Sequence, residues 1–405
     1  MVEGARLESE YTAKPYRGFE SLPLRHFSFA AACGTCLFTM VNPCRGNFMK
    51  LAFALLLFLF ASPAIAQPAP APIDPPLLMP QMQLHDPWIV AHKEAGLYYL
   101  FTRNERAMTG DRRLGTMVYT SRDLRHWTRP RIVFALPESG TWAKAGSWAP
   151  EVHEWNGKWY LFATFHDEQA SLAPVGTRRP YRRGTIMAVS DRIDGPYTPV
   201  DKGEPVAPRE MMTLDGTLHV EPDGTPWYVF AHEWLQTTVG TIEAMPLTRD
   251  LKLAGKPRLL FRANEAEWAK GQLQPDGDTV WVTDGPELFR TKSGTLLMLW
   301  SSYGEGGYVQ ALARSRSGRI EGPWEQLGPL VKRDSGHGML FRRFDGQLMM
   351  VLHRPFTRAL GKLYEMRDDG DRVSVVREAT ELDLEAYPTH PCIPRATVGK
   401  RPPDC

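Results

Sequence analysis

Four acidic residues and one histidine stand at the start of five similar stretches of the chain: Asp86, Glu151, Asp215, Asp284 and His337. A single acid before a turn usually forms the turn or caps it. Four carboxylates brought to one place would repel one another unless some were protonated, hydrogen-bonded or bound to a metal. Such a cluster is unfavourable and so indicates a functional site. Repulsion also raises the pKa of one acid while another stays ionised, which is the division that general acid–base catalysis needs.

Each of these residues is followed by a short apolar strand, a turn that ends in glycine and a second apolar strand. Examples of the second strand are Gly96-Leu-Tyr-Tyr-Leu-Phe101, Gly157-Lys-Trp-Tyr-Leu-Phe162 and Gly294-Thr-Leu-Leu-Met-Leu-Trp300. This pattern predicts a β-hairpin. The five copies begin 65, 64, 69 and 53 residues apart, and a further pair of strands follows most of them.

Four strands per repeat of this length are typical of a propeller blade. We therefore predict an all-β protein, a five-bladed β-propeller, in preference to two unrelated β domains. The innermost strand of each blade starts near the central axis, so the five polar residues would converge on one funnel.

The composition narrows the class of protein. The chain has 405 residues, with 48 Lys and Arg against 46 Asp and Glu, and 11% of its residues are aromatic. Balanced charge and abundant aromatic residues argue against a disordered chain. A net charge of +2 gives no reason to expect a nucleic-acid partner.

The N-terminal region predicts export. Residues 49–66 read as a signal peptide, with Lys50 before the apolar run 51–61 and Ala64-Ile-Ala66 at its end. Residues 1–48 are then expected to be an artefact of the assigned start. Residues 67–80 form a proline-rich lead-in to a propeller over 81–395. We expect a periplasmic or secreted protein without membrane insertion after signal cleavage. The pairing of Cys392 with Cys405 in a disulfide is left open.

Paired carboxylates without a nucleophile triad suggest cleavage of glycosidic bonds, in which one acid protonates the leaving oxygen and another activates water. Three segments agree with this hypothesis: His85-Asp86-Pro87, Trp148-Ala-Pro-Glu151 and Asp284-Gly-Pro286. They resemble the signature segments of glycoside hydrolase family 43, and the resemblance covers nearly all of residues 80–390. It implies a five-bladed propeller that hydrolyses glycosidic bonds with inversion and requires no cofactor.

The resemblance also implies roles for three residues. Asp86 matches the general base, Glu151 the acid that modulates the donor's pKa, and Asp284 the proton donor. The family most often has Asp at the second position and Glu at the third, so this chain departs from the pattern twice. Glu287, three residues after Asp284, is therefore the alternative proton donor.

Six further residues are candidates for contact with the substrate: His85, Trp88, Trp148, Asp215, His232 and His337. The two tryptophans would stack on sugar rings, although tryptophan in a strand is just as often part of the core. Asp215 and His232 could instead cap or close their hairpin. His337 matches a histidine found deep in the pocket of many relatives, often near bound calcium, so a structural Ca²⁺ near His337 is a further expectation.

The implied substrates are oligosaccharides or polysaccharides, with α-L-arabinofuranosides or β-D-xylosides as the expected sugars and β-galactosides as the alternative. A non-catalytic carbohydrate-binding β-propeller is the rival hypothesis, and the two departures from the family pattern keep it open.

Overall fold

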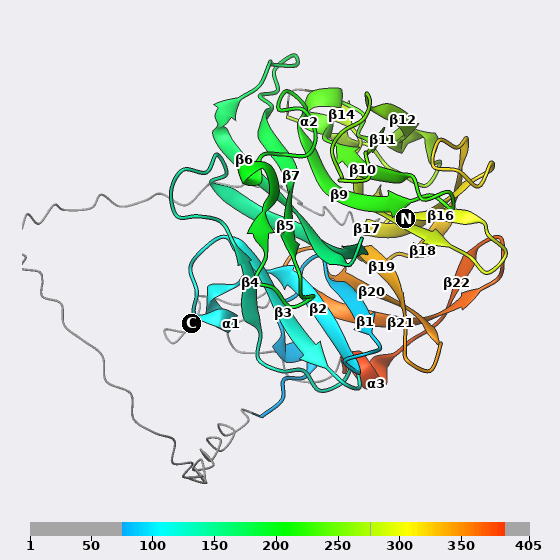
Figure 1. The fold of residues 1–405 in the computed structure, drawn as a ribbon. Helices are drawn as coiled ribbons and strands as arrows, with labels where there is room; N and C mark the ends of the chain where they lie inside the picture. The colour runs from blue at the N-terminus through cyan, green and yellow to red at the C-terminus, as the bar shows by residue number, and fades with distance from the viewer. Residues whose placement is uncertain (1–74, 276, 385–405) are drawn as a thin grey trace, which may run out of the picture. The chain divides into compact units, whose positions relative to one another are not determined.

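Five four-stranded antiparallel sheets follow one another along the chain in the computed structural model, which describes residues 75–275 and 277–384 (Figure 1). In every sheet the four strands are consecutive in sequence and neighbours in space. This confirms the predicted five-bladed β-propeller. The predicted signal peptide, most of the lead-in, the end of the propeller at 395, and Cys392 and Cys405 lie outside the described residues.

The blades have the following strands. Blade 1 contains β1 (Trp88–His92), β2 (Leu97–Arg103), β3 (Gly115–Ser121) and β4 (Arg131–Ala135). Blade 2 contains β5 (Ala145–Trp155), β6 (Lys158–Ser171), β7 (Tyr181–Ser190) and β8 (Thr198–Pro199). Blade 3 contains β9 (Thr213–Val220), β10 (Pro226–His232), β11 (Thr241–Pro246) and β12 (Arg258–Arg262). Blade 4 contains β15 (Asp284–Arg290), β16 (Leu296–Gly304), β17 (Gly307–Ser315) and β18 (Trp324–Val331). Blade 5 contains β19 (Gly336–Arg342), β20 (Leu348–Arg354), β21 (Leu360–Asp368) and β22 (Val373–Glu378).

The remaining elements are short and lie in the connections. They are η1 (Met79–Gln81), α1 (Arg106–Thr109), η2 (Val200–Gly203), α2 (Trp234–Thr237), η3 (Ala263–Glu265), the hairpin β13 (Gln272–Leu273) with β14 (Thr279–Val280), and α3 (Thr380–Asp383). Within the described residues, none of the helices has the length and apolar character needed to cross a membrane.

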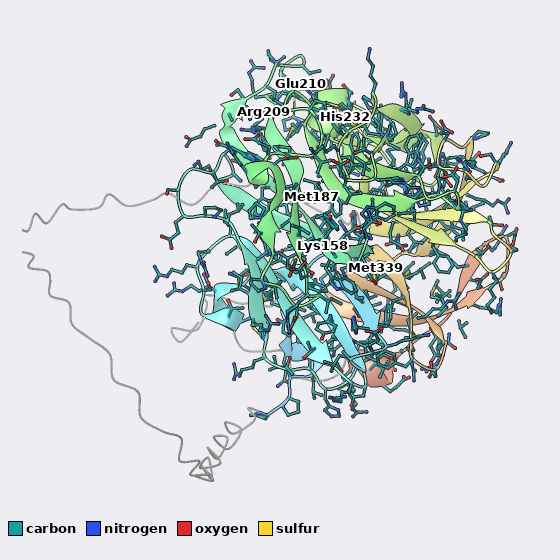
Figure 2. The ribbon with its side chains drawn as sticks, in the orientation of Figure 1. Lys158, Met187, Arg209, Glu210, His232 and Met339 are labelled. Carbon is teal, nitrogen blue, oxygen red and sulfur yellow. The ribbon has the colours of Figure 1, made fainter. Side chains whose placement is uncertain are left out.

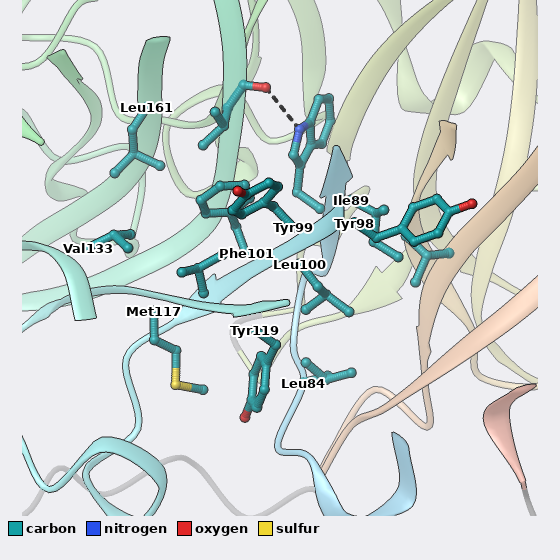
Figure 3. Packing of buried hydrophobic residues seen from close by; sticks show 14 of the residues in the cluster. Leu84, Ile89, Tyr98, Tyr99, Leu100, Phe101, Met117, Tyr119, Val133 and Leu161 are labelled. Atoms are coloured by element: carbon teal, nitrogen blue, oxygen red, sulfur yellow. Dashed lines mark hydrogen bonds between the residues drawn. The ribbon is translucent and has the colours of Figure 1, made fainter. Parts of the chain in front are cut away.

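The core lies between the blades. Because each sheet packs against a neighbour on both faces, a second strand such as β16 is a continuous apolar run rather than an alternating one. Apolar clusters join blades 2 and 3, blades 3 and 4, and blades 4 and 5, and a larger cluster joins blades 5, 1 and 2. Figure 3 shows part of this larger cluster, with Leu100 and Phe101 of β2, Met117 of β3 and Leu161 of β6.

Among residues 75–384, no strand is shared between the first and last blades. Instead, side chains and the segment before β1 hold blade 1 against blade 5. The N–H of Phe344 donates to the Tyr98 hydroxyl at 3.0 Å. Met79 of η1 is fully buried against Gly361, where a Cβ atom would come within 3.0 Å of the Met79 sulfur. Side-chain contacts, rather than a shared strand, therefore join blades 1 and 5 in the described residues.

In every blade, one repeated position near the start of the first strand has a left-handed backbone, and blade 2 has two more such residues, Gly146 and Ser147. The φ angles are 49° at Asp86, 44° at Ala149, 53° at Asp215, 53° at Gly285 and 51° at His337. Four of the five are not glycine, although a left-handed conformation is unfavourable for other residues. The β-ladder becomes irregular here, between Asp284 and Glu287 for example.

These left-handed residues define the true repeat. Asp86, Asp215 and His337 occupy the repeated position, as the sequence predicts. The alignment of the other two blades was wrong, because Glu151 lies two residues after Ala149 and Asp284 lies one residue before Gly285. Glu151 is therefore equivalent to Glu287 in blade 4. Asp284 shares its position with His85 and Trp148.

Candidate active site

Asp86 is a buried carboxylate surrounded by three imidazoles. Its Oδ1 lies 2.8 Å from Nδ1 of His85 and 3.3 Å from Nδ1 of His337. Nδ1 of His353 also lies 3.3 Å from Oδ1 and accepts the backbone N–H of Asp86 at 3.2 Å. Its Oδ2 accepts the N–H of Ala149 at 3.2 Å. Burial alone would raise the pKa of Asp86, but the charges of His337 and His85 and the hydrogen bonds at this carboxylate hold the pKa well below its usual range. Asp86 is therefore ionised, as a general base must be.

Asp215 lies beside this group and is also buried. Its Oδ2 accepts the N–H of Gly285 at 3.0 Å and lies 3.8 Å from Nδ1 of His337. Burial, together with the charge of Asp86, raises the pKa of Asp215 to about 6. The hydrogen bond to Gly285 ties Asp215 to the residue that follows Asp284.

Asp284 opens β15 and is only partly buried. Its Oδ2 accepts a hydrogen bond from the hydroxyl of Tyr308 at 2.9 Å. Burial first, and then the charges of Asp215 and Glu233, raise the pKa of Asp284 well above its usual value. The raised pKa favours the protonated form of Asp284, which is the form that a proton donor needs, and the side chain is within reach of solvent.

His337 lies between the carboxylates. Burial alone would lower its pKa, but the charges of Asp86, Asp215 and Asp284 raise the pKa of His337 to about 8. The ring is therefore a cation at neutral pH. This imidazolium offsets part of the repulsion that the sequence predicts for a cluster of acids.

Glu151 and Glu287 lie deeper in the central channel. They line a cavity of about 10 Å³ together with Asp86, His337 and Met339, which has room for one water molecule. The carboxylate of Glu151 lies 3.2 Å from Nε2 of His153. Burial and then the charge of Glu151 raise the pKa of Glu287 well above its usual value. Because Glu287 is only 7% exposed, it is less accessible to a substrate than Asp284.

Two of the predicted contact residues are held by other protein groups. Trp88 is 8% exposed and lines the central cavity beside Asp86, and its indole N–H donates to the carbonyl of Val152 at 3.1 Å, so its contact with sugar stays a prediction. His232 lies with Nδ1 at 3.0 Å from Glu243 and Nε2 at 2.8 Å from Gln236. Both of its ring nitrogens are thus occupied within blade 3, and Figure 2 shows His232 apart from Met339, which lines the central cavity.

Trp148 and His85 remain close to the site and partly exposed. The guanidinium of Arg183 lies 4.8 Å from the centre of the Trp148 ring, and His166 packs 4.7 Å from it. Arg183 also forms a buried ion pair with Glu233. Trp148 is therefore held in a fixed orientation at the level of Asp284.

The sequence analysis missed residues on the second and third strands, among them Arg183, Tyr308 and His353. A signal for some of them exists. The N–H of the left-handed residue donates to a second-strand side chain of the preceding blade: Asp215 to Thr164 at 2.9 Å, His337 to Ser301 at 2.8 Å and Asp86 to His353 at 3.2 Å. Ser301 and His353 each stand 16 residues after the left-handed residue of their own blade.

One group of possible metal ligands lies beside Asp86. In the described part of the chain, the ligand atoms of His85, Asp86 and His353 lie within 4.8 Å of one another. Calcium takes six to eight oxygen ligands, whereas two imidazoles and one carboxylate suit a transition metal. This group therefore does not suit calcium, and the calcium expected near His337 stays a prediction.

Comparisons with known proteins agree with this geometry. The family model described as "Glycosyl hydrolases family 43" matches residues 78–370. The solved endo-arabinase from Bacteroides thetaiotaomicron is 34% identical, with a TM-score of 0.65, over 74% of this chain and 100% of that one. An endo-1,4-β-xylanase from the same organism (21% identity, TM-score 0.57, 74% and 96% covered) and a β-1,3-galactosidase (18%, 0.52, 73% and 94%) share the fold. No curated protein sequence matches the chain.

The charge on His337 predicts a pH-dependent stability. Because its folded-state pKa of about 8 lies above the ordinary 6.5, His337 stabilises the fold fully below pH 6.5, and this contribution is lost as the pH rises through 8. We expect the wild type to lose about 2 kcal/mol more stability than His337→Gln between about pH 6 and about pH 9. Urea unfolding at the two pH values measures this, with the exposed His126→Gln as control. Equal losses in wild type and His337→Gln would contradict it.

Proposed function

Because the chain belongs to family 43 of the glycosyl hydrolases, we propose that it hydrolyses α-L-arabinofuranosidic bonds with inversion at the anomeric carbon. Support for arabinose comes from the likeness to the endo-arabinase. Of the three solved structures described above, it is the one whose sequence is more than 25% identical to this chain. β-D-Xylosides are the second candidate. The predicted export to the periplasm or medium stays a proposal that rests on residues 49–66.

This proposal rests on one observation: the surroundings of three aspartates give their carboxyl groups different pKa values. Asp86 has its pKa far below the usual value, Asp215 has a pKa of about 6, and Asp284 has its pKa far above the usual value. One ionised and one protonated carboxyl group in a single site are what glycoside hydrolysis requires.

The proposed reaction uses Asp86 as base and Asp284 as acid. Asp86 accepts a proton from a water molecule, whose oxygen forms a bond to the anomeric carbon. Asp284 gives its proton to the leaving oxygen as the glycosidic bond breaks. In an inverting enzyme, the two carboxyl groups stand roughly 6.5–9.5 Å apart to leave room for that water. Neither residue needs a cofactor for these steps.

We assign the modulation of the donor to Asp215 rather than to Glu151, which the family resemblance had suggested. After burial, the charge of Asp215 contributes most to the raised pKa of Asp284, and Asp215 is bonded to Gly285. The carboxylate of Glu151 instead faces His153 and interacts with Glu287. Glu151 and Glu287 would then shape the floor of the site.

Substrate contacts are proposed for Trp148 and His85. The ring of Trp148 is partly exposed, so one face is available to stack on a sugar. His85 is 23% exposed while its Nδ1 stays on Asp86, which leaves Nε2 for a sugar hydroxyl. Both residues share the repeat position of Asp284, just before the left-handed residue.

Asparagine substitutions test the base and the acid. We expect Asp86→Asn and Asp284→Asn each to lower kcat/KM on nitrophenyl α-L-arabinofuranoside by about 100-fold or more, since each removes a proton-transfer group. The matched control is Asp191→Asn, an exposed surface residue. Asp284→Asn should recover part of its activity on dinitrophenyl glycosides, whose leaving group needs no proton. NMR of the released sugar identifies inversion.

Equal turnover by wild type and both variants would end this assignment of base and acid. No turnover by the wild type on any of these glycosides would favour the sugar-binding propeller. Parallel assays on nitrophenyl xyloside and galactoside identify the sugar.

The two candidate modulators are separated by their effect on pH dependence. Asp215→Asn removes the negative charge that raises the pKa of Asp284 but keeps an oxygen for the Gly285 N–H. We expect the alkaline limb of kcat/KM to move to lower pH in this variant, and to stay in place in Glu151→Gln. The opposite pattern would return the modulating role to Glu151.

Removal of metal ions tests the conclusion from the donor set. We expect dialysis against EDTA to leave both kcat/KM and Tm unchanged, because the group of His85, Asp86 and His353 offers calcium a single carboxylate. A loss of activity that added Ca²⁺ restores, and Mg²⁺ does not, would show that a calcium site exists.

A further inference from the structure

The phenol of Tyr308 faces the carboxyl group of Asp284. Tyr308 lies near the start of β17 in blade 4. Asp284 opens β15 of the same blade, and β16 lies between these two strands. The ring of Tyr308 is 1% exposed, and its hydroxyl donates to Oδ2 of Asp284 at 2.9 Å. Tyr308 thus contacts the proposed proton donor directly while it remains covered by protein.

Packing fixes the position of this hydroxyl. His353 lies parallel to the Tyr308 ring, with an interplanar angle of 5° and a centroid distance of 5.8 Å, and Phe356 meets its edge at 4.9 Å. Gly336 lies against the ring so closely that a Cβ atom there would be 2.3 Å from Cε1 of Tyr308. The backbone N–H of Tyr308 donates to Asp334 at 3.1 Å. The phenol is therefore held in place independently of Asp284.

A tyrosine hydroxyl has a single proton. Because Tyr308 donates that proton to Oδ2, the proton that a neutral Asp284 carries resides on Oδ1. We propose that Tyr308 is a positioning residue that confines the transferable proton of Asp284 to Oδ1 and stabilises the carboxylate left after transfer. This inference rests on the proposed role of Asp284 as proton donor.

The hydrogen bond from Tyr308 to Asp284 becomes stronger as Asp284 loses its proton. The O–H bond at Oδ1 breaks as the leaving oxygen takes the proton, and the electron pair stays on Asp284. The hydrogen bond from Tyr308 then ends on a full carboxylate, and charge-assisted hydrogen bonds are about twice as strong as neutral ones. An interaction that strengthens toward the transition state lowers the barrier.

Tyr308 keeps its own proton throughout. Burial and the charges of Asp284 and Asp215 raise the pKa of Tyr308 well above its usual value. The phenol therefore acts as a fixed donor and does not compete with Asp284 as an acid.

The variant Tyr308→Phe tests this role, because it keeps the ring and its packing and removes the hydroxyl. We expect kcat on an arabino-oligosaccharide to fall about 10-fold or more with KM nearly unchanged. We also expect the alkaline limb of the pH profile to move to higher pH, because a bond that favours ionised Asp284 is lost. The fall should be smaller on dinitrophenyl glycosides. A purely structural role would lower Tm without moving the limb.

Tyr303→Phe is the matched control. Its ring lies 5.5 Å from that of Tyr308 and also packs against Phe356, so it removes a nearby hydroxyl without removing the bond to Asp284. We expect its kcat and pH profile to match the wild type. Should Tyr308→Phe fold poorly, 3,5-difluorotyrosine at position 308 keeps the hydroxyl, makes it a stronger donor and should move the alkaline limb to lower pH.

Unchanged kcat and an unchanged alkaline limb in Tyr308→Phe, or an unmoved limb with difluorotyrosine, would overturn the inference. This failure is distinguishable from failure of the proposed function. If Asp284→Asn is inactive while Tyr308→Phe behaves as wild type, only the role of Tyr308 is lost. If Asp284→Asn is fully active, the donor assignment itself fails.

Discussion

The buried carboxylate of Asp86 is the group on which the rest of the site depends. An ionised carboxylate away from water is strongly unfavourable unless it is paired and hydrogen-bonded. The partners of this carboxylate come from three blades: His85 from blade 1, the N–H of Ala149 from blade 2 and His337 from blade 5, where His353 also accepts the backbone N–H of Asp86. Blades 1 and 5 are also the pair that must meet to close the ring. The contacts that keep the proposed base ionised therefore also join the two ends of the propeller, so catalytic geometry and ring closure are stabilised together.

Three aspartates with the same intrinsic pKa are made different by what surrounds them. Asp86 faces imidazoles, Asp215 accepts one backbone N–H, and Asp284 stands next to the negative Asp215 and Glu233. The imidazolium of His337 lies between them and limits their repulsion. Since the groups interact strongly, measured titrations will belong to the cluster rather than to single residues. Substitution of one member is thus expected to move the titration of the others, which is why pH profiles are more informative here than rates at one pH.

Much of the fold could be predicted from sequence because the hairpins are local. Glycine turns between apolar strands recur five times, and Asp86, Asp215 and His337 stand at the repeated position. The rest depends on contacts that sequence does not display. The sequence pattern places the acids of the five repeats at equivalent positions. The feature that repeats in the structure is instead a left-handed residue, which is Ala149 in blade 2 and Gly285 in blade 4. Trp88 has the same residue type as Trp148, and only the packing of blade 1 on blade 2 buries it. Tyr308 comes from the third strand of blade 4, which β16 separates from Asp284 in the sheet, so their contact crosses a strand and is not visible as a sequence spacing.

The left-handed residues explain how a stack of ordinary sheets acquires a polar centre. The first strand of each blade is an edge strand, so only alternate N–H groups enter the ladder with the second strand. The left-handed residue directs its N–H to the preceding blade, where the acceptor is a side chain of the second strand or a carboxylate such as that of Asp86 or Asp215. Each non-glycine residue in this conformation costs about 1–2 kcal/mol, and strain of this kind persists where the surrounding contacts over-determine it. The cross-blade hydrogen bonds are those contacts. They offset the strain, hold the blades in register around the axis, and place the residues before and after each turn, Asp284 and Glu287 among them, at different depths of one channel.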